Sequence, residues 1–288
     1  MHKKYHSLPR ALFAHGNSGL NLSSGEAFYN EKGTQIMNAL NGIGSKDKET
    51  LGAGVYRQFG KHREGFDIVS NMSDEEATLV VTAGTAMYGL TELGGLVAGE
   101  SVVVTGPGPI GLMGAAVAKA LGAQPVILTG TRDNRLEIGK KLGADHVINV
   151  RNEDVVSKVR ELTGGKGVDY VVECAGAPSG INEAAQMVNR GGKICLAAFP
   201  GSNAEVDIAH IVRNNIYLFG IRGEGKTATH RAEAYMRQKR FDATLIHTHT
   251  FEMKDLKEAL RYAKDRVEDA IKVVVKNPYA QAKKVAAE

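Results

Sequence analysis

Ser101–Ala123, SVVVTGPGPIGLMGAAVAKALGA, combines a short apolar strand, a glycine-rich turn and a helix built from small residues. The run Val102–Thr105 is β-branched and apolar, as the central strands of a parallel sheet are. Glycines then follow in G-x-G-x-x-G spacing, and small or apolar residues continue to Leu121. A glycine turn between a strand and a helix is typical of a site that binds a dinucleotide diphosphate at the helix N-terminus. An ordinary strand–turn–helix unit is the alternative interpretation.

The residues of this turn have separate predicted tasks. Gly106 closes the tight turn, Gly108 lets the backbone approach the pyrophosphate, and Gly111 permits close packing of the helix on the strand. Pro109 and Ile110 open the helix, where the missing N–H group of proline costs nothing. We expect these five residues to bind the cofactor.

Strand and helix patterns alternate along the middle of the chain. The predicted strands are Val102–Thr105, Pro125–Thr129, Asp145–Val150, Val168–Cys174, Lys193–Phe199 and Ile216–Ile221. The predicted intervening helices after the first are Asp133–Leu142, Asp154–Leu162 and Gly180–Val188, with a turn at Arg190-Gly-Gly. This alternation predicts an α/β fold with a doubly wound, parallel, six-stranded sheet of the Rossmann type.

The flanking regions give weaker signals. Ser73 and Glu76 form a capping box, which opens a helical stretch toward Gly94 with a break or bend at Gly84. A short helix is plausible at Thr34–Asn41. Beyond Gly225 the pattern predicts helices and strands at His230–Gln238, Thr244–Phe251, Lys254–Lys264 and Ala270–Val275.

Composition excludes several classes of protein. With 288 residues, 43% of them hydrophobic, the chain can bury a sizeable core. The net charge of +4 comes from scattered basic residues, which does not indicate nucleic-acid binding, and no apolar run is long enough for a membrane span. Cys174 and Cys195 lie in expected buried strands and are interpreted as small core residues. We expect a cytoplasmic protein that acts on a small-molecule substrate.

Seven sequence segments resemble the medium-chain dehydrogenase/reductase superfamily, particularly its zinc-dependent alcohol and polyol dehydrogenases. They follow the family order from Ser73 to Lys276: SDEEATL, GTAMYGL, the glycine-rich stretch, KKLGADHVIN, GVDYVVECAGA, RGGKI and AIKVVV. The resemblance implies a nicotinamide-dependent oxidoreductase that transfers a hydride. It also implies a homodimer or homotetramer joined through the last strand, Ile216–Ile221.

The resemblance sets the expected domain organisation. Residues 76–225 would form the dinucleotide-binding domain. Residues 1–75 would be a reduced and divergent remnant of the catalytic domain, to which residues 226–288 return as a helix–strand segment.

The zinc ligands of the resembling family have no counterpart in this sequence. No cysteine precedes Cys174, and the nearest match to the family's Gly-His-Glu is His15-Gly16-Asn17. Val81 stands where the polyol branch has a glutamate. A catalytic zinc needs three protein ligands and an open position, so we expect no zinc site of the family type. The remaining histidines are interpreted as surface residues rather than metal ligands: His2, His6, His15, His62, His247 and His249.

The end of the second predicted strand bears on the choice of dinucleotide. In folds of this kind an acidic residue here accepts hydrogen bonds from the adenosine ribose, but this sequence has Gly130. Thr131 can donate a hydroxyl hydrogen bond, and Arg132, helped by Arg135, offers a guanidinium group to a 2′-phosphate. This arrangement resembles that of NADP-using members and favours NADP over NAD. Alternatively, Arg132 faces solvent at a helix entrance.

Candidates for the chemistry come from the resemblance. Thr85 would lie against the nicotinamide, or it could bond back to its own helical turn. Tyr88 and His62 are possible proton donors, for which a structural role is the alternative. Lys272 matches a basic position near the pyrophosphate, although it could equally face solvent. The backbone groups expected to face the carboxamide belong to Ala175, Gly176, Ala177, Ala198 and Phe199.

Two function classes remain open. The first is a zinc-independent NADP(H) oxidoreductase that acts on an alcohol, carbonyl, quinone or activated alkene. The second is a catalytically silent nucleotide-binding relative, or an alcohol dehydrogenase with a rearranged N-terminal region. The basic run Gln58-Phe-Gly-Lys-His-Arg-Glu, where the family has an ordered strand, favours the second class.

Overall fold

The computed structural model describes residues 11–14, 72–92, 95–225 and 227–276. The chain divides into two compact units, residues 79–246 and a second unit formed by residues 1–78 with 247–288. The sequence predicts these boundaries at 75/76 and 225/226. The expected helix at Thr34–Asn41 and the histidines at positions 2, 6, 15 and 62 lie outside the described residues.

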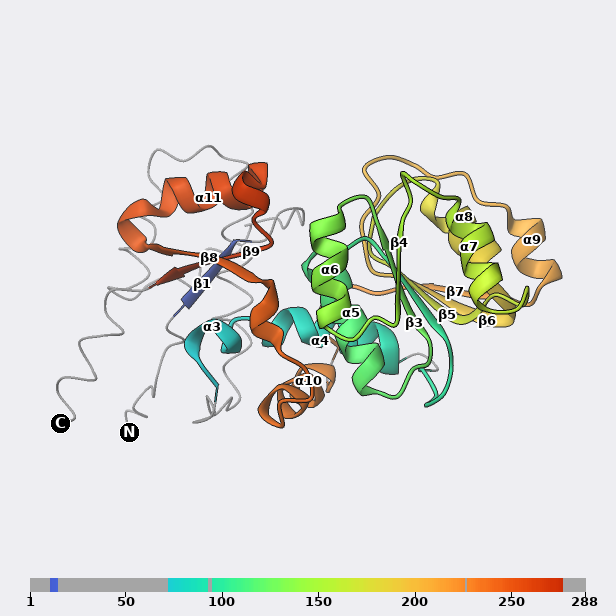
Figure 1. Cartoon of the computed structure of the whole chain (residues 1–288), viewed down its shortest axis with the longest axis horizontal. Coiled ribbons are helices and arrows are strands. Elements are labelled where there is room, and N and C mark those ends of the chain that lie inside the picture. The colour runs from blue at the N-terminus through green and yellow to red at the C-terminus, as the bar shows by residue number, and fades with distance from the viewer. Residues whose placement is uncertain (1–10, 15–71, 93–94, 226, 277–288) are drawn as a thin grey trace, which may run out of the picture. The chain divides into compact units, whose positions relative to one another are not determined.

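The larger unit contains a parallel sheet of six strands in the order β4-β3-β2-β5-β6-β7 (Figure 1). The sheet is formed by β2 Val102–Thr105, β3 Val126–Gly130, β4 His146–Asn149, β5 Val168–Glu173, β6 Val188–Leu196 and β7 Tyr217–Gly220. All five pairings are parallel. The predicted doubly wound sheet is therefore confirmed.

Helices cover both faces of this sheet, with α5 and α6 on one side and α7 and α8 on the other (Figure 1). These helices are α5 Pro109–Ala120, α6 Asp133–Lys141, α7 Val155–Leu162 and α8 Gly180–Met187. Central strands are buried on both faces, as their unbroken apolar runs predict. A further short helix, α9 Ile208–Arg213, was not predicted; the carboxylate of Asp207 accepts the His210 N–H group at its start.

The helical stretch after Ser73 is interrupted earlier than the sequence predicts. Its two helices are α3 Asp74–Ala77 and α4 Val80–Thr91. The helical conformation is therefore interrupted at residues 78–79, and α4 continues through Gly84. The Ser73 hydroxyl accepts the Glu76 N–H group at 3.1 Å, as the capping box requires. A Cβ atom on Gly84 would lie 2.9 Å from Oγ1 of Thr229, next to helix α10 Ala228–Arg237. Glycine is needed there for close helix packing, not for a bend.

Two other boundaries were wrong. The predicted turn at Arg190-Gly-Gly falls within β6, at an irregularity where the register with β5 shifts and regular pairing resumes at Lys193. The strand begins at Val188 and ends at Leu196 instead of Phe199. The predicted strand from Thr244 begins instead with a 3-10 turn, η3 Ala243–Ile246, and the strand β8 follows.

The smaller unit contains a three-stranded sheet in the order β1-β9-β8. Its elements are β1 Ala11–Ala14, β8 His247–Glu252, η4 Met253–Asp255, α11 Leu256–Asp265, η5 Val267–Asp269 and β9 Lys272–Lys276. Strand β9 is antiparallel to β1 and parallel to β8. Buried residues of α11 and β9 form its apolar core, which includes Leu256, Ala259 and Val273.

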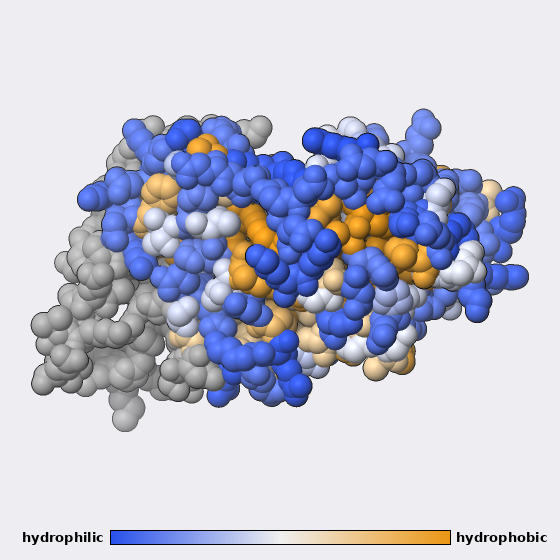
Figure 2. Space-filling view, in the orientation of Figure 1, coloured by the Kyte–Doolittle hydropathy of each residue, from blue (hydrophilic) through white to orange (hydrophobic). Residues whose placement is uncertain are grey.

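The surface of the visible face is mainly hydrophilic, with apolar patches between the polar side chains (Figure 2). Within the described ranges, no helix is long and apolar enough to cross a membrane.

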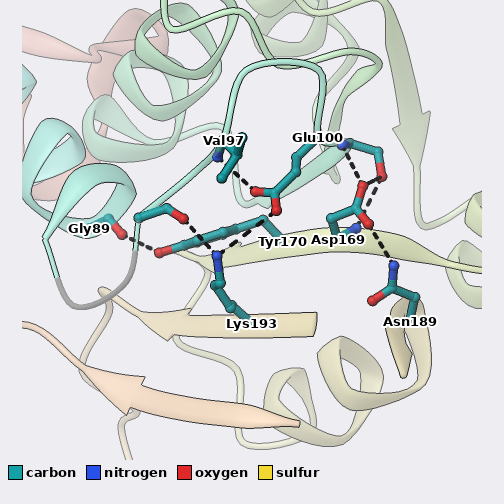
Figure 3. Close-up of polar contacts among 9 residues, drawn as sticks. Gly89, Val97, Glu100, Asp169, Tyr170, Asn189 and Lys193 are labelled. Carbon is teal, nitrogen blue, oxygen red and sulfur yellow. Dashed lines mark hydrogen bonds and ion pairs between the residues drawn. The ribbon is translucent and has the colours of Figure 1, made fainter. Parts of the chain in front are cut away.

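A half-buried carboxylate fixes the N-terminal edge of the six-stranded sheet (Figure 3). Asp169 Oδ2 accepts the N–H and hydroxyl groups of Ser101 at 2.8 and 2.7 Å. Its Oδ1 accepts the Asn189 amide at 2.6 Å. Burial alone would raise the pKa of Asp169, but these hydrogen bonds outweigh it and hold the pKa below its ordinary value of 3.8.

We expect Asp169→Asn to destabilise the protein at pH 7 and to have less effect in acid. Because the folded-state pKa is depressed, the stability from the charged group is present above the unfolded-chain pKa of about 3.9. It is lost as the pH falls through the folded pKa. Urea midpoints of the two proteins at pH 7 and pH 2.5 test this, and an equal gap at both pH values would contradict it.

The segment between α4 and β2 is tied to the same edge of the sheet (Figure 3). The buried Tyr170 hydroxyl donates to the Gly89 carbonyl, and burial raises the pKa of that phenol. Lys193 Nζ donates to the Gly95 carbonyl at 2.7 Å and lies 5.8 Å from the centroid of the Tyr170 ring. These contacts join the segment that leads into β2 to strands β5 and β6.

Candidate dinucleotide site

The carboxyl ends of β2 and β5 define the position of the site. These two strands are neighbours in the sheet, and the chain winds outward from them in both directions. Loops that leave adjacent strands in opposite directions open a crevice at this point, which is where α/β sheets bind ligands. Thr105 and Glu173 are the paired last residues of the two strands.

The three glycines of the turn have three different environments. Gly106 has a φ of +82°, and its Cβ would lie 2.8 Å from Ala175 Cα. A Cβ on Gly111 would lie 2.0 Å from the Gly106 carbonyl oxygen, so a side chain would separate helix from turn. A Cβ on Gly108 would meet nothing within 4 Å. The fold itself therefore needs Gly106 and Gly111, whereas Gly108 faces open space.

Helix α5 begins at this open space. Gly108 is its N-cap residue, with an extended φ of −82° and ψ of 178°, and makes no side-chain cap bond. Pro109 is the first helical residue, and Ile110 and Gly111 follow with N–H groups for which helix geometry supplies no partner. Together with the positive end of the helix dipole, these groups can bind a diphosphate.

Glu173, which was not predicted as a site residue, organises the loop after β5. This carboxylate is buried, and its Oε1 accepts the N–H groups of Ala175 and Gly176, each at 2.9 Å. The Thr105 hydroxyl donates to the same oxygen at 3.3 Å and accepts the N–H group of Cys174 at 3.2 Å. A glutamate directly after the buried residues Val171 and Val172 was the available signal.

The loops after β5 and β6 lie side by side. The Glu173 carbonyl accepts the N–H group of Ala198 at 3.2 Å. A Cβ on Gly176 would lie 3.0 Å from the Phe199 carbonyl oxygen. Ala177 and Phe199 are exposed, so backbone groups of both loops reach the surface near the crevice.

The residues at the end of β3 and just after it differ in burial. Gly130 is buried, Thr131 is exposed, and Arg132 is half-buried. Arg135 is buried, and its Nη1 donates to the Pro107 carbonyl at 3.5 Å, so it contacts the glycine-rich turn. The arginine nearer to the surface is therefore Arg132.

The two candidates for chemistry lie on α4. The Thr85 hydroxyl donates to the Val81 carbonyl at 3.2 Å, as the alternative interpretation describes. The Tyr88 ring packs against Gly225, whose Cβ would lie 2.7 Å from Cδ2 of the ring. Lys272 belongs to the other unit, where it is buried in β9 rather than facing solvent.

Among the described residues, no three His, Cys, Asp or Glu side chains are grouped so as to hold a metal ion. The two histidines of β8 have other contacts. His247 Nε2 lies 2.8 Å from the Thr250 hydroxyl, and His249 Nε2 lies 3.4 Å from the Glu268 carboxylate. Both cysteines are free, and burial raises the pKa of each thiol.

Comparison with known proteins agrees with this geometry. Residues 109–238 match the family described as zinc-binding dehydrogenase. L-Threonine 3-dehydrogenase of Pseudoalteromonas translucida is 34% identical over 215 residues, which are 72% of this chain and 62% of that protein. The enzyme of the same name from Chromobacterium violaceum is 32% identical over 218 residues, 73% of this chain and 63% of that protein.

Solved structures show the same fold. An oxidoreductase/dehydrogenase of unknown specificity from Escherichia coli superposes with a TM-score of 0.68 at 27% identity, over 72% of this chain and 59% of that one. For 2R,3R-butanediol dehydrogenase from Bacillus subtilis the TM-score is 0.67 at 25% identity, over 74% and 60%. The chain thus spans less than two thirds of the length of these relatives. The order of the motifs, the sheet and the glycine-rich turn identify the chain as a member of the medium-chain dehydrogenase/reductase superfamily.

Proposed function

We propose that the protein is an NADP(H)-dependent oxidoreductase that interconverts an alcohol and a carbonyl compound, or reduces a quinone-type substrate, without zinc. The observation that carries the proposal is the open space at Gly108, in front of the N-terminus of α5. A side chain at that position would fill the place of a diphosphate, and no structural contact requires its absence. The residues present therefore fit a dinucleotide.

The residues around the crevice would divide the binding of the cofactor between them. The N–H groups of Ile110 and Gly111 would bind the diphosphate. Arg132 and Thr131 would bind the 2′-phosphate, and backbone groups after β5 and β6 would orient the carboxamide. The bound nicotinamide would supply the hydride acceptor or donor.

The substrate class is proposed from the relatives. Threonine 3-dehydrogenase and butanediol dehydrogenase are named for substrates that carry a hydroxyl group. Hydride transfer from such a carbon would leave a carbonyl group, and Tyr88 is the proposed proton donor and acceptor for its oxygen. Thr85 is proposed to position the nicotinamide. A cytoplasmic location remains part of the proposal.

Two measurements test the function. Titration of the purified chain with NADPH and with NADH, followed by cofactor fluorescence, should give the tighter binding for NADPH. Turnover of NADPH with a panel of ketones, aldehydes and quinones should then identify the substrate class. Binding without turnover of any compound would favour the catalytically silent relative, and tighter binding of NADH would overturn the cofactor assignment.

We expect the purified chain to contain no stoichiometric zinc, and chelators to leave its reductase activity unchanged. The physical reason is the ligand set: no cysteine precedes Cys174, and Val81 replaces the family's glutamate. Elemental analysis after purification without added metal checks this. About one zinc ion per chain would falsify the expectation.

We further propose a homodimer, or a dimer of dimers, joined through the edge strand β7 and its flanks, Ile216–Ile221. In the described sheet β7 pairs only with β6, and Tyr217 is 65% exposed. An uncovered apolar edge favours pairing with another chain. Leu218→Pro removes one donor from the strand and should give monomers or aggregates. Light scattering that shows the unmodified protein to be monomeric at tens of micromolar would contradict the proposal.

A further inference from the structure

Gly130 is enclosed by the glycine-rich turn. It is the last residue of β3, at the position where an acidic residue would bind the adenosine ribose. A Cβ atom on Gly130 would lie 2.3 Å from Cδ and 2.5 Å from Cγ of Pro107. Real Cβ atoms do not approach other heavy atoms so closely, so no side chain fits at this position as the structure stands.

The backbone of Gly130 does not itself demand glycine. Its φ lies outside the left-handed region that favours glycine, in contrast to Gly106 with a φ of +82°. An L-residue could therefore adopt this conformation. The contact with Pro107 alone excludes a side chain.

Neither side of this contact can easily move away. Cδ of Pro107 is bonded to the backbone nitrogen, so the ring cannot turn aside as a flexible side chain would. The turn is held to β3 by the hydrogen bond from Gly106 N to the Thr129 carbonyl, 2.8 Å. Gly130 is held to β4 because its carbonyl accepts the N–H group of Val150 at 2.9 Å. On its other side, the Pro107 carbonyl accepts Arg135 Nη1 at 3.5 Å.

The first acid after Gly130 has another partner. Asp133 Oδ1 accepts the side-chain amide of Asn149 at 2.7 Å, at the end of β4. Between Gly130 and the start of α6 at Asp133, the side chains are therefore those of Thr131 and Arg132.

We propose that Pro107, inside the phosphate-binding turn, determines the cofactor class by reserving position 130 for glycine. It thereby keeps an acidic side chain, which would repel a 2′-phosphate and bind a ribose hydroxyl, out of the adenosine end of the site. Pro107 is a positioning residue that acts through Gly130. The consequence for cofactor choice rests on the proposed NADP(H) dependence, whereas the steric coupling of the two positions does not.

The steric part is tested by a double-mutant cycle on thermal unfolding of the full chain. Gly130→Ala adds only the Cβ atom and should lower Tm by several degrees, on the order of 5 °C, since overpacking of a fixed contact is destabilising. In the Pro107→Ala background, which lacks Cγ and Cδ, the same change should have less than half of that effect. Gly201→Ala is the matched control, because its φ also lies outside the left-handed region and its Cβ would meet nothing within 4 Å.

The cofactor part uses Gly130→Asp and measures the ratio of the Kd values for NADH and NADPH. In the Pro107→Ala background the aspartate should fit, and the ratio should move at least tenfold toward NADH. With Pro107 present, Gly130→Asp should weaken the binding of both dinucleotides and lower Tm, because the turn must be displaced. A merely structural role of Pro107 would change Tm without reversing the preference.

The outcomes separate the two claims. Additive effects of the Ala changes on Tm, or a Gly130→Asp protein that binds NADH tightly with Pro107 intact, would overturn the role of Pro107. If the unmodified protein prefers NADH while the changes in Tm remain coupled, the proposed NADP(H) dependence fails and the steric coupling stands. A coupled Tm together with a reversed preference in the double variant supports both.

Discussion

Gly108→Val should abolish the binding of NADPH and of NADH while leaving the protein folded. The Cβ of residue 108 would point into open space, and the extended φ and ψ of the N-cap position suit a β-branched residue. The fold therefore tolerates the change. The added methyl groups would occupy the place where the diphosphate approaches the backbone at the start of α5. Fluorescence titration should show no saturable binding up to millimolar cofactor.

Three variants make this result interpretable. Gly201→Val introduces the same side chain in the segment after β6, where the Cβ would meet nothing within 4 Å, and should leave binding intact. Gly111→Val should instead destabilise the protein, because its Cβ would collide with the Gly106 carbonyl oxygen at 2.0 Å. Gly108→Ala should weaken binding less than valine does. A folded Gly108→Val protein that binds either dinucleotide with unchanged Kd would show that the diphosphate site lies elsewhere.

The central sheet could be predicted because each of its strands is marked by a short pattern within the strand itself. Val102–Thr105 is buried on both faces and therefore reads as an uninterrupted apolar run. The spacing of Gly106, Gly108 and Gly111 predicted a tight turn between strand and helix, because such a turn is determined by one short stretch of chain.

Errors arose where a distant contact decides the conformation. Gly84 was interpreted as a bend, but its lack of a side chain serves the packing of α10, which lies far along the chain. At position 130 the sequence shows only that an acidic side chain is missing. The structure shows that a Cβ atom there would collide with Pro107. Glu173 was overlooked because its partners are N–H groups of a loop, which carry no signature in the sequence. Sequence reasoning therefore identified the residues of the turn better than the residues that support it.

Arg132→Ala should weaken NADPH binding tenfold or more while leaving NADH binding unchanged. Arg132 follows Gly130 at the entrance of α6 and is half-buried, whereas Arg135 is committed to the turn through the Pro107 carbonyl. A charge-assisted hydrogen bond to phosphate contributes about 1.5–3 kcal/mol to the free energy of binding. NADH has no 2′-phosphate and therefore does not make this hydrogen bond. Arg132→Lys should keep part of the affinity, since it retains the charge without the planar fork, and Arg213→Ala on α9 is the control for net charge. Equal losses for both cofactors would mean that Arg132 supports the site without contacting the 2′-phosphate. An unchanged Kd for NADPH would mean that the cofactor's adenosine end lies away from the β3–α6 loop.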